Sequence, residues 1–203
     1  MAEHLLAIDD VKEDFNDILK WAIEFKRMWK SADEIATNFH PLADLAIGSI
    51  YEKPSTRTRV SFEVGINRLG GYPLTLLKND IQLGKSETVA DTANVLSRFL
   101  GAITYRCFAH SDVAELAANS SVPVINALSD KHHPCQAAAD LMTIIEQFPE
   151  NDGLKVAYIG DGNNVLHDLM LACAMLGIKI HYACPKGYEP SSDIIERAEE
   201  HAR

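Results

Sequence analysis

The sequence lacks the excess of basic residues that nucleic-acid-binding and membrane-surface proteins carry. Its 19 lysines and arginines stand against 29 aspartates and glutamates, which gives a formal net charge of −10. Because such partners require a basic face, the composition predicts neither nucleic acid nor membrane as a partner. A few arginines can still bind a small anion inside a cleft, whatever the net charge.

Other features are missing as well. No apolar stretch approaches the ~20 residues of a membrane-spanning helix. The first residues have neither the basic and long apolar regions of a secretory signal nor the composition of a transit peptide, so a cytoplasmic protein is expected. The cysteines show no C-x-x-C spacing, which predicts reduced thiols rather than disulfides.

What the sequence does contain is an alternation of apolar, strand-like segments and amphipathic, helix-like segments. Strands are predicted at 45–51, 72–77, 102–106 and 122–126, and helices at 11–30, 58–69, 88–99, 112–118 and 136–148. This alternation predicts an α/β fold with a parallel sheet flanked by helices. Ligands of such sheets bind beyond the carboxyl ends of the strands. The segment that begins at Ser55, Arg106 and the loop at 126–136 all follow strand ends and are expected to lie there.

A polar segment at 149–153 is typical of a linker. The elements predicted after it are strands at 154–159 and 178–183 and helices at 165–176 and 191–202. We therefore predict a first domain at 1–149 and the start of a second, similar α/β domain at 150–203. Two strands are few for an α/β sheet, so the chain is expected to be truncated at its C-terminus.

The most informative segment, Ser55-Thr56-Arg57-Thr58-Arg59, lies between a predicted buried strand and a predicted helix. The N–H groups at a helix start and the positive end of its dipole bind anions. Hydroxyl and guanidinium groups add hydrogen bonds to a phosphate. Alternatively, Ser55 or Thr56 only caps the helix and the arginines pair with Glu52 and Glu63. The segment by itself leaves both interpretations open.

A second polar cluster contains His132, His133, Cys135 and Gln136. Zinc would need three or four ligands at suitable spacing, and no second Cys/His pair is present, so no metal site is predicted. Pro134 fits the first position of a helix, which places His133 and Gln136 at the helix start. His133 can donate a hydrogen bond and Gln136 can donate and accept, which suits a carbamoyl group.

Together, S-T-R-T-R at 55–59, Arg106 and H-P-C-Q at 133–136 resemble the aspartate/ornithine carbamoyltransferase family. The segments Asp80-Ile81-Gln82-Leu83-Gly84 and G-D-G-N-N at 160–164 are similar to its ornithine branch. The resemblance extends from about residue 45 to the last residue.

The resemblance implies transfer of the carbamoyl group from carbamoyl phosphate to the δ-amine of L-ornithine, in arginine biosynthesis or catabolism and without a cofactor. Arg106 and His133 are implied as catalytic residues that stabilise the oxyanion. The binding residues that it implies are, for the phosphate, Ser55, Thr56, Arg57, Thr58 and Arg106; for the carbonyl oxygen, Arg106 and His133; for the carbamoyl nitrogen, Gln136; and for ornithine, Asn164.

The resemblance also implies a homotrimer, or a multiple of trimers. In the family, the loop that corresponds to the one with Gln82 reaches into the active site of the adjacent subunit. Gln82 is therefore implied as a further ligand of carbamoyl phosphate. The segments with which the family closes its ornithine site do not occur before Arg203, so this chain alone is expected to bind carbamoyl phosphate weakly and to be nearly inactive.

Alternatives remain. A dinucleotide-binding oxidoreductase has only Gly160-x-Gly162 in its favour, and Val165 replaces the third glycine of that fingerprint. The chain could also be a non-catalytic phosphate-binding module. Within the family, the acceptor could be putrescine, acetylated ornithine or aspartate. The loop at 80–84 and Asn163-Asn164 argue against aspartate but do not separate ornithine from putrescine.

Overall fold

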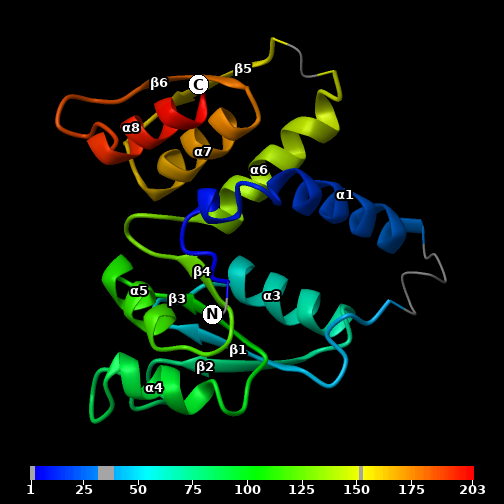
Figure 1. Ribbon diagram of the computed structural model, residues 1–203, viewed down its shortest axis with the longest axis vertical. Helices are drawn as coiled ribbons and strands as arrows, with labels where there is room; N and C mark the ends of the chain where they lie inside the picture. Colours follow the sequence, from blue (N-terminus) through cyan, green and yellow to red (C-terminus); the bar gives the residue numbers. More distant parts are fainter. Residues whose placement is uncertain (1–2, 32–38, 151–152) are drawn as a thin grey trace. The chain divides into compact units, whose positions relative to one another are not determined.

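A computed structural model describes residues 3–31, 39–150 and 153–203 (Figure 1). The chain divides into two compact units, Met1–Leu6 with Arg27–Ser129 and Ala7–Lys26 with Asp130–Arg203. Two residues of the predicted linker, 151 and 152, lie outside the described residues.

The first unit is built on a four-stranded parallel sheet with the strand order β2–β1–β3–β4. The connections between these strands contain three helices. Figure 1 shows α3 on one side of the sheet and α4 and α5 on the other, as right-handed crossovers require for this strand order. The predicted α/β fold is confirmed. The elements are β1 (Ala46–Tyr51), α3 (Arg57–Arg68), β2 (Tyr72–Leu77), α4 (Val89–Leu96), β3 (Ala102–Arg106), α5 (His110–Ala118) and β4 (Val124–Leu128).

Several predicted boundaries differ from the observed ones by one to four residues, and two of these differences have a clear cause. The first helix was predicted from residue 11, but α1 (Phe15–Ser31) begins later because a 3₁₀ turn, η1 (Ile8–Val11), precedes it. The last strand of the first unit was predicted at 122–126. It begins at Val124 because Pro123 has no N–H with which to pair, and an added pair at its end extends it to Leu128.

The two faces of this sheet differ in polarity. Ile50 and Tyr105 are fully buried and pack in an apolar cluster with side chains of α4 and α5. Because successive side chains of a strand point to opposite faces, Tyr51 and Arg106 lie on the other face, which α3 covers. These two residues are paired across β1 and β3 at the carboxyl ends of both strands. The sheet thus directs polar side chains to the edge where a ligand was expected.

From residue 130 on, the second unit contains a two-stranded parallel sheet and three helices; η1 and most of α1 also belong to this unit. The apolar side chains of α7 pack on all sides, and residues Leu166–Cys173 are all buried. No helix in the described ranges is long and apolar enough to cross a bilayer. The elements are α6 (Pro134–Gln147), β5 (Lys155–Ile159), α7 (Asn164–Met175), β6 (Lys179–Ala183) and α8 (Ser192–His201).

The turn after β5 brings the backbone of Gly162 against the segment 188–190. The Gly162 N–H donates to the Tyr188 carbonyl at 2.7 Å. A Cβ atom on Gly162 would lie 2.2 Å from the backbone nitrogen of Pro190 and 2.4 Å from the carbonyl carbon of Glu189. Close approach of two backbone segments therefore explains this glycine, and the dinucleotide alternative loses its only support.

We expect Gly162→Ala to lower the free energy of unfolding by about 1–3 kcal/mol, because the added methyl group overlaps with backbone atoms that cannot rotate away. Gly65→Ala in α3 is the matched control. Nothing lies within 4 Å of a Cβ atom there, and replacing glycine inside a helix raises stability by about 0.5–1 kcal/mol. Urea unfolding followed by circular dichroism measures both changes. Equal stabilities of the two variants would contradict this account of Gly162.

Candidate functional site

The predicted anion-binding segment lies where β1 ends and α3 begins. Thr56 occupies the N-cap position of α3, but its side chain makes no capping hydrogen bond. The first N–H groups of a helix have no intrahelical partner, and the positive end of the helix dipole lies there. The helix-cap interpretation is therefore not supported for Thr56, and the start of α3 can accept an anion.

The two arginines of the segment differ in their partners. The Nε atom of Arg59 lies 2.9 Å from Oε1 of Glu63, which also accepts a 2.5 Å hydrogen bond from the Thr75 hydroxyl. The hydrogen bond from Thr75 lowers the pKa of Glu63, and the bond from Arg59 lowers it further by a smaller amount. Within the described residues, the side chain of the exposed Arg57 forms no hydrogen bond or ion pair. Pairing with Glu63 is thus observed for Arg59, while Arg57 can still bind a ligand.

Arg106 reaches the start of α3 from the end of β3. Its Nη1 atom lies 3.5 Å from the Thr58 hydroxyl oxygen, at the limit of a hydrogen bond. Burial lowers the pKa of Arg106, yet an arginine remains charged in proteins. Its buried Nε atom has no hydrogen-bond partner among the described residues. The structure therefore brings Thr58 and Arg106 together, with donors of Arg106 still to be used.

Glu52, directly after β1, connects the carboxyl ends of three strands. One carboxylate oxygen accepts a hydrogen bond from Lys78 Nζ, after β2, at 2.9 Å. The other accepts from the N–H of Phe108, after β3, at 3.0 Å. The side chain of Glu52 is 6% exposed. Glu52, expected from the sequence only as a partner of the arginines, instead fixes the position from which the Ser55 segment begins.

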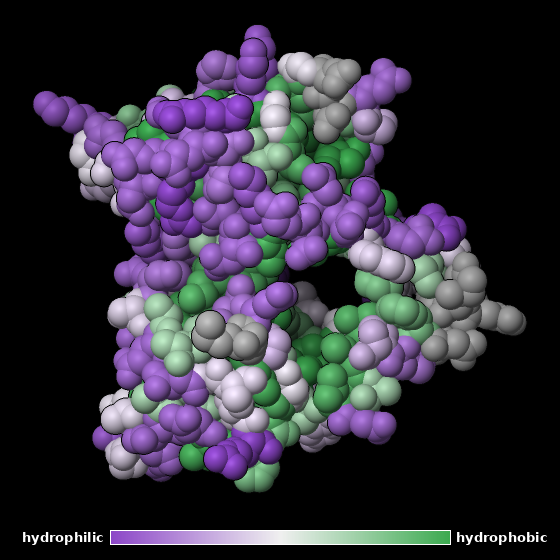
Figure 2. Space-filling model, viewed as in Figure 1, coloured by the Kyte–Doolittle hydropathy of each residue, from purple (hydrophilic) through white to green (hydrophobic). Residues whose placement is uncertain are grey.

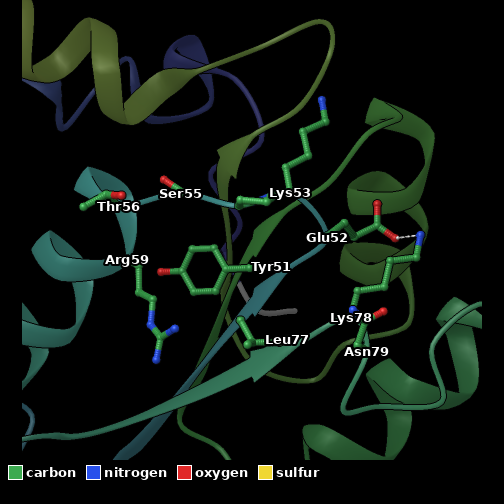
Figure 3. Close-up of a pocket in the computed structure, with 10 residues that line it drawn as sticks. Tyr51, Glu52, Lys53, Ser55, Thr56, Arg59, Leu77, Lys78 and Asn79 are labelled. Carbon is green, nitrogen blue, oxygen red and sulfur yellow. Dashed lines mark hydrogen bonds and ion pairs between the residues drawn. The ribbon is translucent and has the colours of Figure 1, made fainter.

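A cavity of about 440 Å³ opens at the carboxyl ends of β1 and β2 (Figure 3). Figure 3 shows the Tyr51 hydroxyl directed to the side where Thr56 and Arg59 lie. That hydroxyl is buried and has no partner among the described residues, and burial raises the pKa of Tyr51, so the group stays protonated and can donate. The lining residues are Tyr51, Glu52, Lys53, Pro54, Ser55, Thr56, Arg59, Leu77, Lys78 and Asn79.

Arg57 is not among the residues that line this cavity. It lines a shallow groove along the helix together with Val60 and Val64, which are 53% and 43% exposed. Figure 2 shows hydrophobic side chains gathered over α3. Ser55 and Thr56 thus line the cavity, Thr58 contacts Arg106, and Arg57 borders an apolar surface.

Gln82 is exposed on the loop between β2 and α4. Its carbonyl accepts hydrogen bonds from the N–H groups of Lys85 and Glu87, and its side-chain oxygen accepts one from Ser86 at 3.2 Å. These partners all belong to its own loop, so the structure does not bring Gln82 to the Ser55 segment. Its contact with a neighbouring subunit stays a prediction.

His133 and Gln136 belong to the second unit. Pro134 occupies the first turn of α6 and His133 its N-cap position, as predicted. His133 is 9% exposed, and its carbonyl accepts from the Gln136 N–H at 3.0 Å. The exposed Gln136 side chain donates to Asp140 at 2.9 Å. Both side chains lie at one helix start, but the carbamoyl contacts assigned to them stay predictions.

Two of the four thiols are poor candidates for a nucleophile. Burial raises the pKa of Cys135 to about 12, with a further contribution from the charge of Asp168. Burial also raises the pKa of Cys173 to about 12. Both thiols are therefore protonated at neutral pH. Among the residues that the structure describes, no group of three or more His, Cys, Asp or Glu side chains could hold a metal ion.

The turn before α7 contains the predicted ornithine ligand, Asn164. The neighbouring Asn163 caps the helix, since its side-chain oxygen accepts from the N–H groups of Val165 and Leu166 at 3.0 and 3.2 Å. Asn164 is the first residue of α7 and is half-buried. Its contact with ornithine stays a prediction.

His167 uses both ring nitrogens in its neutral form. Nδ1 lies 2.8 Å from the Lys131 carbonyl, to which it can only donate, so Nε2 accepts from the Ser191 N–H at 3.2 Å. Burial, with a smaller contribution from His132, lowers the pKa of His167 below 6.5. His167 thus serves to hold two backbone segments of the second unit together.

This lowered pKa predicts a pH dependence. Below 6.5 the unfolded chain binds the His167 proton more readily, so stability present above that pH is lost as the pH falls through the folded-state pKa. Urea unfolding between about pH 7.5 and 5 is expected to show a smaller loss of stability in His167→Gln than in the wild type. Parallel curves for the two proteins would exclude His167 as a source of the pH dependence.

Comparisons with known proteins agree with this geometry. The family model described as "Aspartate/ornithine carbamoyltransferase, carbamoyl-P binding domain" matches residues 3–146. The model described as "Aspartate/ornithine carbamoyltransferase, Asp/Orn binding domain" matches residues 152–203. Together the two matches include most of the chain.

Among curated relatives, a catabolic ornithine carbamoyltransferase of Thermoplasma volcanium is 46% identical over 199 residues, 98% of this chain and 63% of the relative. An ornithine carbamoyltransferase of Thermococcus kodakarensis is 50% identical over 194 residues, 96% of this chain and 60% of the relative. The chain thus spans about three fifths of the length of the curated relatives that it matches.

Solved structures are similar over the same extent. The ornithine carbamoyltransferase of Pyrococcus furiosus has a TM-score of 0.90 and 47% identity, over 99% of this chain and 64% of that one. A mitochondrial ornithine carbamoyltransferase of Coccidioides immitis has a TM-score of 0.92 and 41% identity, over 100% of this chain and 66% of that one.

Proposed function

Because this chain belongs to the aspartate/ornithine carbamoyltransferase family, we propose that the protein to which it belongs transfers the carbamoyl group of carbamoyl phosphate to the δ-amine of L-ornithine. The products are citrulline and phosphate. The observation that carries the proposal is the start of α3, where no side chain caps the helix and Arg106 meets Thr58. Relatives named as ornithine carbamoyltransferases, 46–50% identical to this chain, support the choice of acceptor.

In the proposed site, Ser55, Thr56, Arg57 and Thr58 bind the phosphate together with the N–H groups at the start of α3. Arg106 binds phosphate through donors that include its Nε atom, which has no partner among the residues that the structure describes. A guanidinium and several N–H groups make charge-assisted bonds that are about twice as strong as neutral ones. These groups neutralise the charge that gathers on the phosphate as it leaves.

The proposed reaction is an addition followed by an elimination, without a covalent enzyme intermediate. The uncharged δ-amine attacks the carbonyl carbon and a tetrahedral oxyanion forms; the bond between that carbon and the phosphate oxygen then breaks, and the proton of the attacking nitrogen leaves with the phosphate. Arg106, His133 and Thr58 are proposed to stabilise the oxyanion, a contribution of roughly 10²–10³ in rate for each donor. Gln136 is proposed to bind the carbamoyl nitrogen, and Asn164 the amino-acid part of ornithine.

We further propose that the protein needs no cofactor and no metal, and that it works in the cytoplasm as a homotrimer or a multiple of trimers. Gln82 then acts in the site of a neighbouring subunit, which agrees with its exposure and with its contacts inside its own loop. The relatives include a catabolic enzyme, so arginine biosynthesis and arginine catabolism are both compatible with the family. Putrescine remains the alternative acceptor.

Titration calorimetry of this 203-residue chain with carbamoyl phosphate tests the phosphate site. Arg57→Ala is expected to weaken binding at least roughly tenfold, because it removes a charged donor. Arg68→Ala removes the same charge from the other end of α3, where Arg68 packs over the Trp29 ring, and is expected to leave binding unchanged. If both variants lose the same affinity for carbamoyl phosphate, the effect of Arg57→Ala comes from the change in net charge and not from a contact of Arg57.

No binding by the folded wild-type chain at roughly millimolar ligand would overturn the phosphate site. Since the chain spans three fifths of its relatives' length, we expect it to form little or no citrulline alone. Addition of a C-terminal piece that completes the second domain is expected to restore carbamoyl transfer. Binding of the phosphate without any transfer in that reconstituted protein would favour the alternative of a non-catalytic binding module.

A further inference from the structure

A fully buried carboxylate, that of Asp168 in α7, lies against the segment that precedes α6. Asp168 is 0% exposed. Its Oδ1 atom accepts from the Ile8 N–H at 2.8 Å and lies 3.1 Å from Nδ1 of His132. Its Oδ2 atom accepts from the N–H of His133. All of these residues belong to the second unit.

The contacts determine how each partner is held. A carboxylate only accepts hydrogen bonds, so Nδ1 of His132 must carry the proton that it donates. The His132 ring is 2% exposed and also packs edge-on against His167 at a centroid distance of 6.4 Å. A buried carboxylate is tolerated when several donors satisfy it, and replacing one of its oxygens by an amide NH2 group leaves at least one of those donors without its acceptor. His132 therefore has one tautomer and one orientation.

Two neighbouring residues of α7 hold three successive residues of this segment. His167 bonds the carbonyl of Lys131, and Asp168 bonds the ring of His132 and the N–H of His133. His133, at the N-cap of α6, has φ −143° and ψ 67°, outside helical and regular strand geometry. The direction in which its side chain leaves the backbone thus depends on the bond between its N–H and Asp168.

We propose that Asp168 is a positioning residue: it fixes the backbone of His133 and so aims that imidazole at the carbonyl oxygen of the carbamoyl group. The assignment of His133 to the carbamoyl oxygen rests on the proposed function. Asp168 itself touches no substrate. Its loss affects recognition of the carbamoyl end, whereas the phosphate end is bound by residues of α3 and β3.

The experiment compares the wild-type chain with Asp168→Asn, which keeps the shape and removes the charge. Asp9→Asn is the matched control. Asp9 is also a largely buried carboxylate of the second unit, bonded by Arg197 and His201, but it does not contact His132 or His133. Nitrogen-15 NMR of the imidazoles and amides reports the His132 tautomer and the His133 N–H. Titrations with carbamoyl phosphate and with inorganic phosphate report the two ends of the site.

The expected wild-type spectrum shows His132 protonated at Nδ1 and the His133 N–H shifted downfield by a charged acceptor. Asp168→Asn is expected to lose both signatures and to weaken carbamoyl phosphate roughly tenfold relative to phosphate, the effect of one charged hydrogen bond. Asp9→Asn is expected to keep both signatures and the affinity ratio, even if it lowers stability equally.

Other outcomes separate the possible failures. If folded Asp168→Asn binds both ligands as the wild type does, or loses affinity for both by the same factor, the ratio of the two affinities is unchanged. Asp168 would then have a purely structural role. A wild-type His132 protonated at Nε2 would overturn the proposal without any variant, which covers the case in which Asp168→Asn does not fold. If the wild-type chain binds neither ligand, the proposed function fails, and the two NMR signatures alone decide whether Asp168 holds His133.

Discussion

The phosphate end of the site depends on the hydrogen bonds that the carboxylate of Glu52 accepts. Parallel strands end at one edge of a sheet, but the hydrogen bonds between the strands do not fix the loops that follow the strand ends. Glu52 supplies that constraint, because it accepts from Lys78 beyond β2 and from the Phe108 N–H beyond β3 while its own N–H bonds the Arg106 carbonyl. The Lys78 side chain is 42% exposed, so solvent weakens this ion pair, and the bond from the Phe108 N–H to the largely buried carboxylate adds to it. The position of the Ser55 segment relative to Arg106 therefore follows from one nearly buried side chain.

The site also shows how an acidic chain can recognise an anion. The net charge is −10, yet cations gather at the carboxyl ends of β1, β2 and β3 because several carboxylates there are already satisfied by partners. Glu52 is bonded to Lys78, and Glu63 to Arg59 and Thr75. Arg57 and Arg106 keep donors that no described residue uses. Local pairing, rather than the overall charge, determines what the site can bind.

Much of the fold could be predicted because it depends on local patterns. The apolar segments and their spacing predicted each described strand, and Pro134 predicted the start of α6. Similarity of short motifs indicated which side chains to examine. The sequence could not show hydrogen bonds between residues that are far apart in the chain. The bonds of Glu52 with Phe108 and of Asp168 with Ile8 have no local sequence signal. The same limitation explains why Arg57 and Arg59 looked equivalent in sequence, although only Arg59 has Glu63 one helical turn away and Thr75 on the adjacent strand to complete its network.

Neither compact unit is one continuous stretch of chain, since residues 7–26 belong with residues 130–203. This connectivity bears on the order of events during synthesis. The sheet of the first unit is complete once β4 has left the ribosome. The Ile8 N–H, in contrast, waits for Asp168, and Phe15 and Leu19 wait for the apolar side chains of α6 and α7. Until then, an early-made amphipathic helix has no apolar surface to cover it, and exposed surface of this kind promotes aggregation. The apolar face of this helix thus stays exposed until the later helices of the second unit have been made.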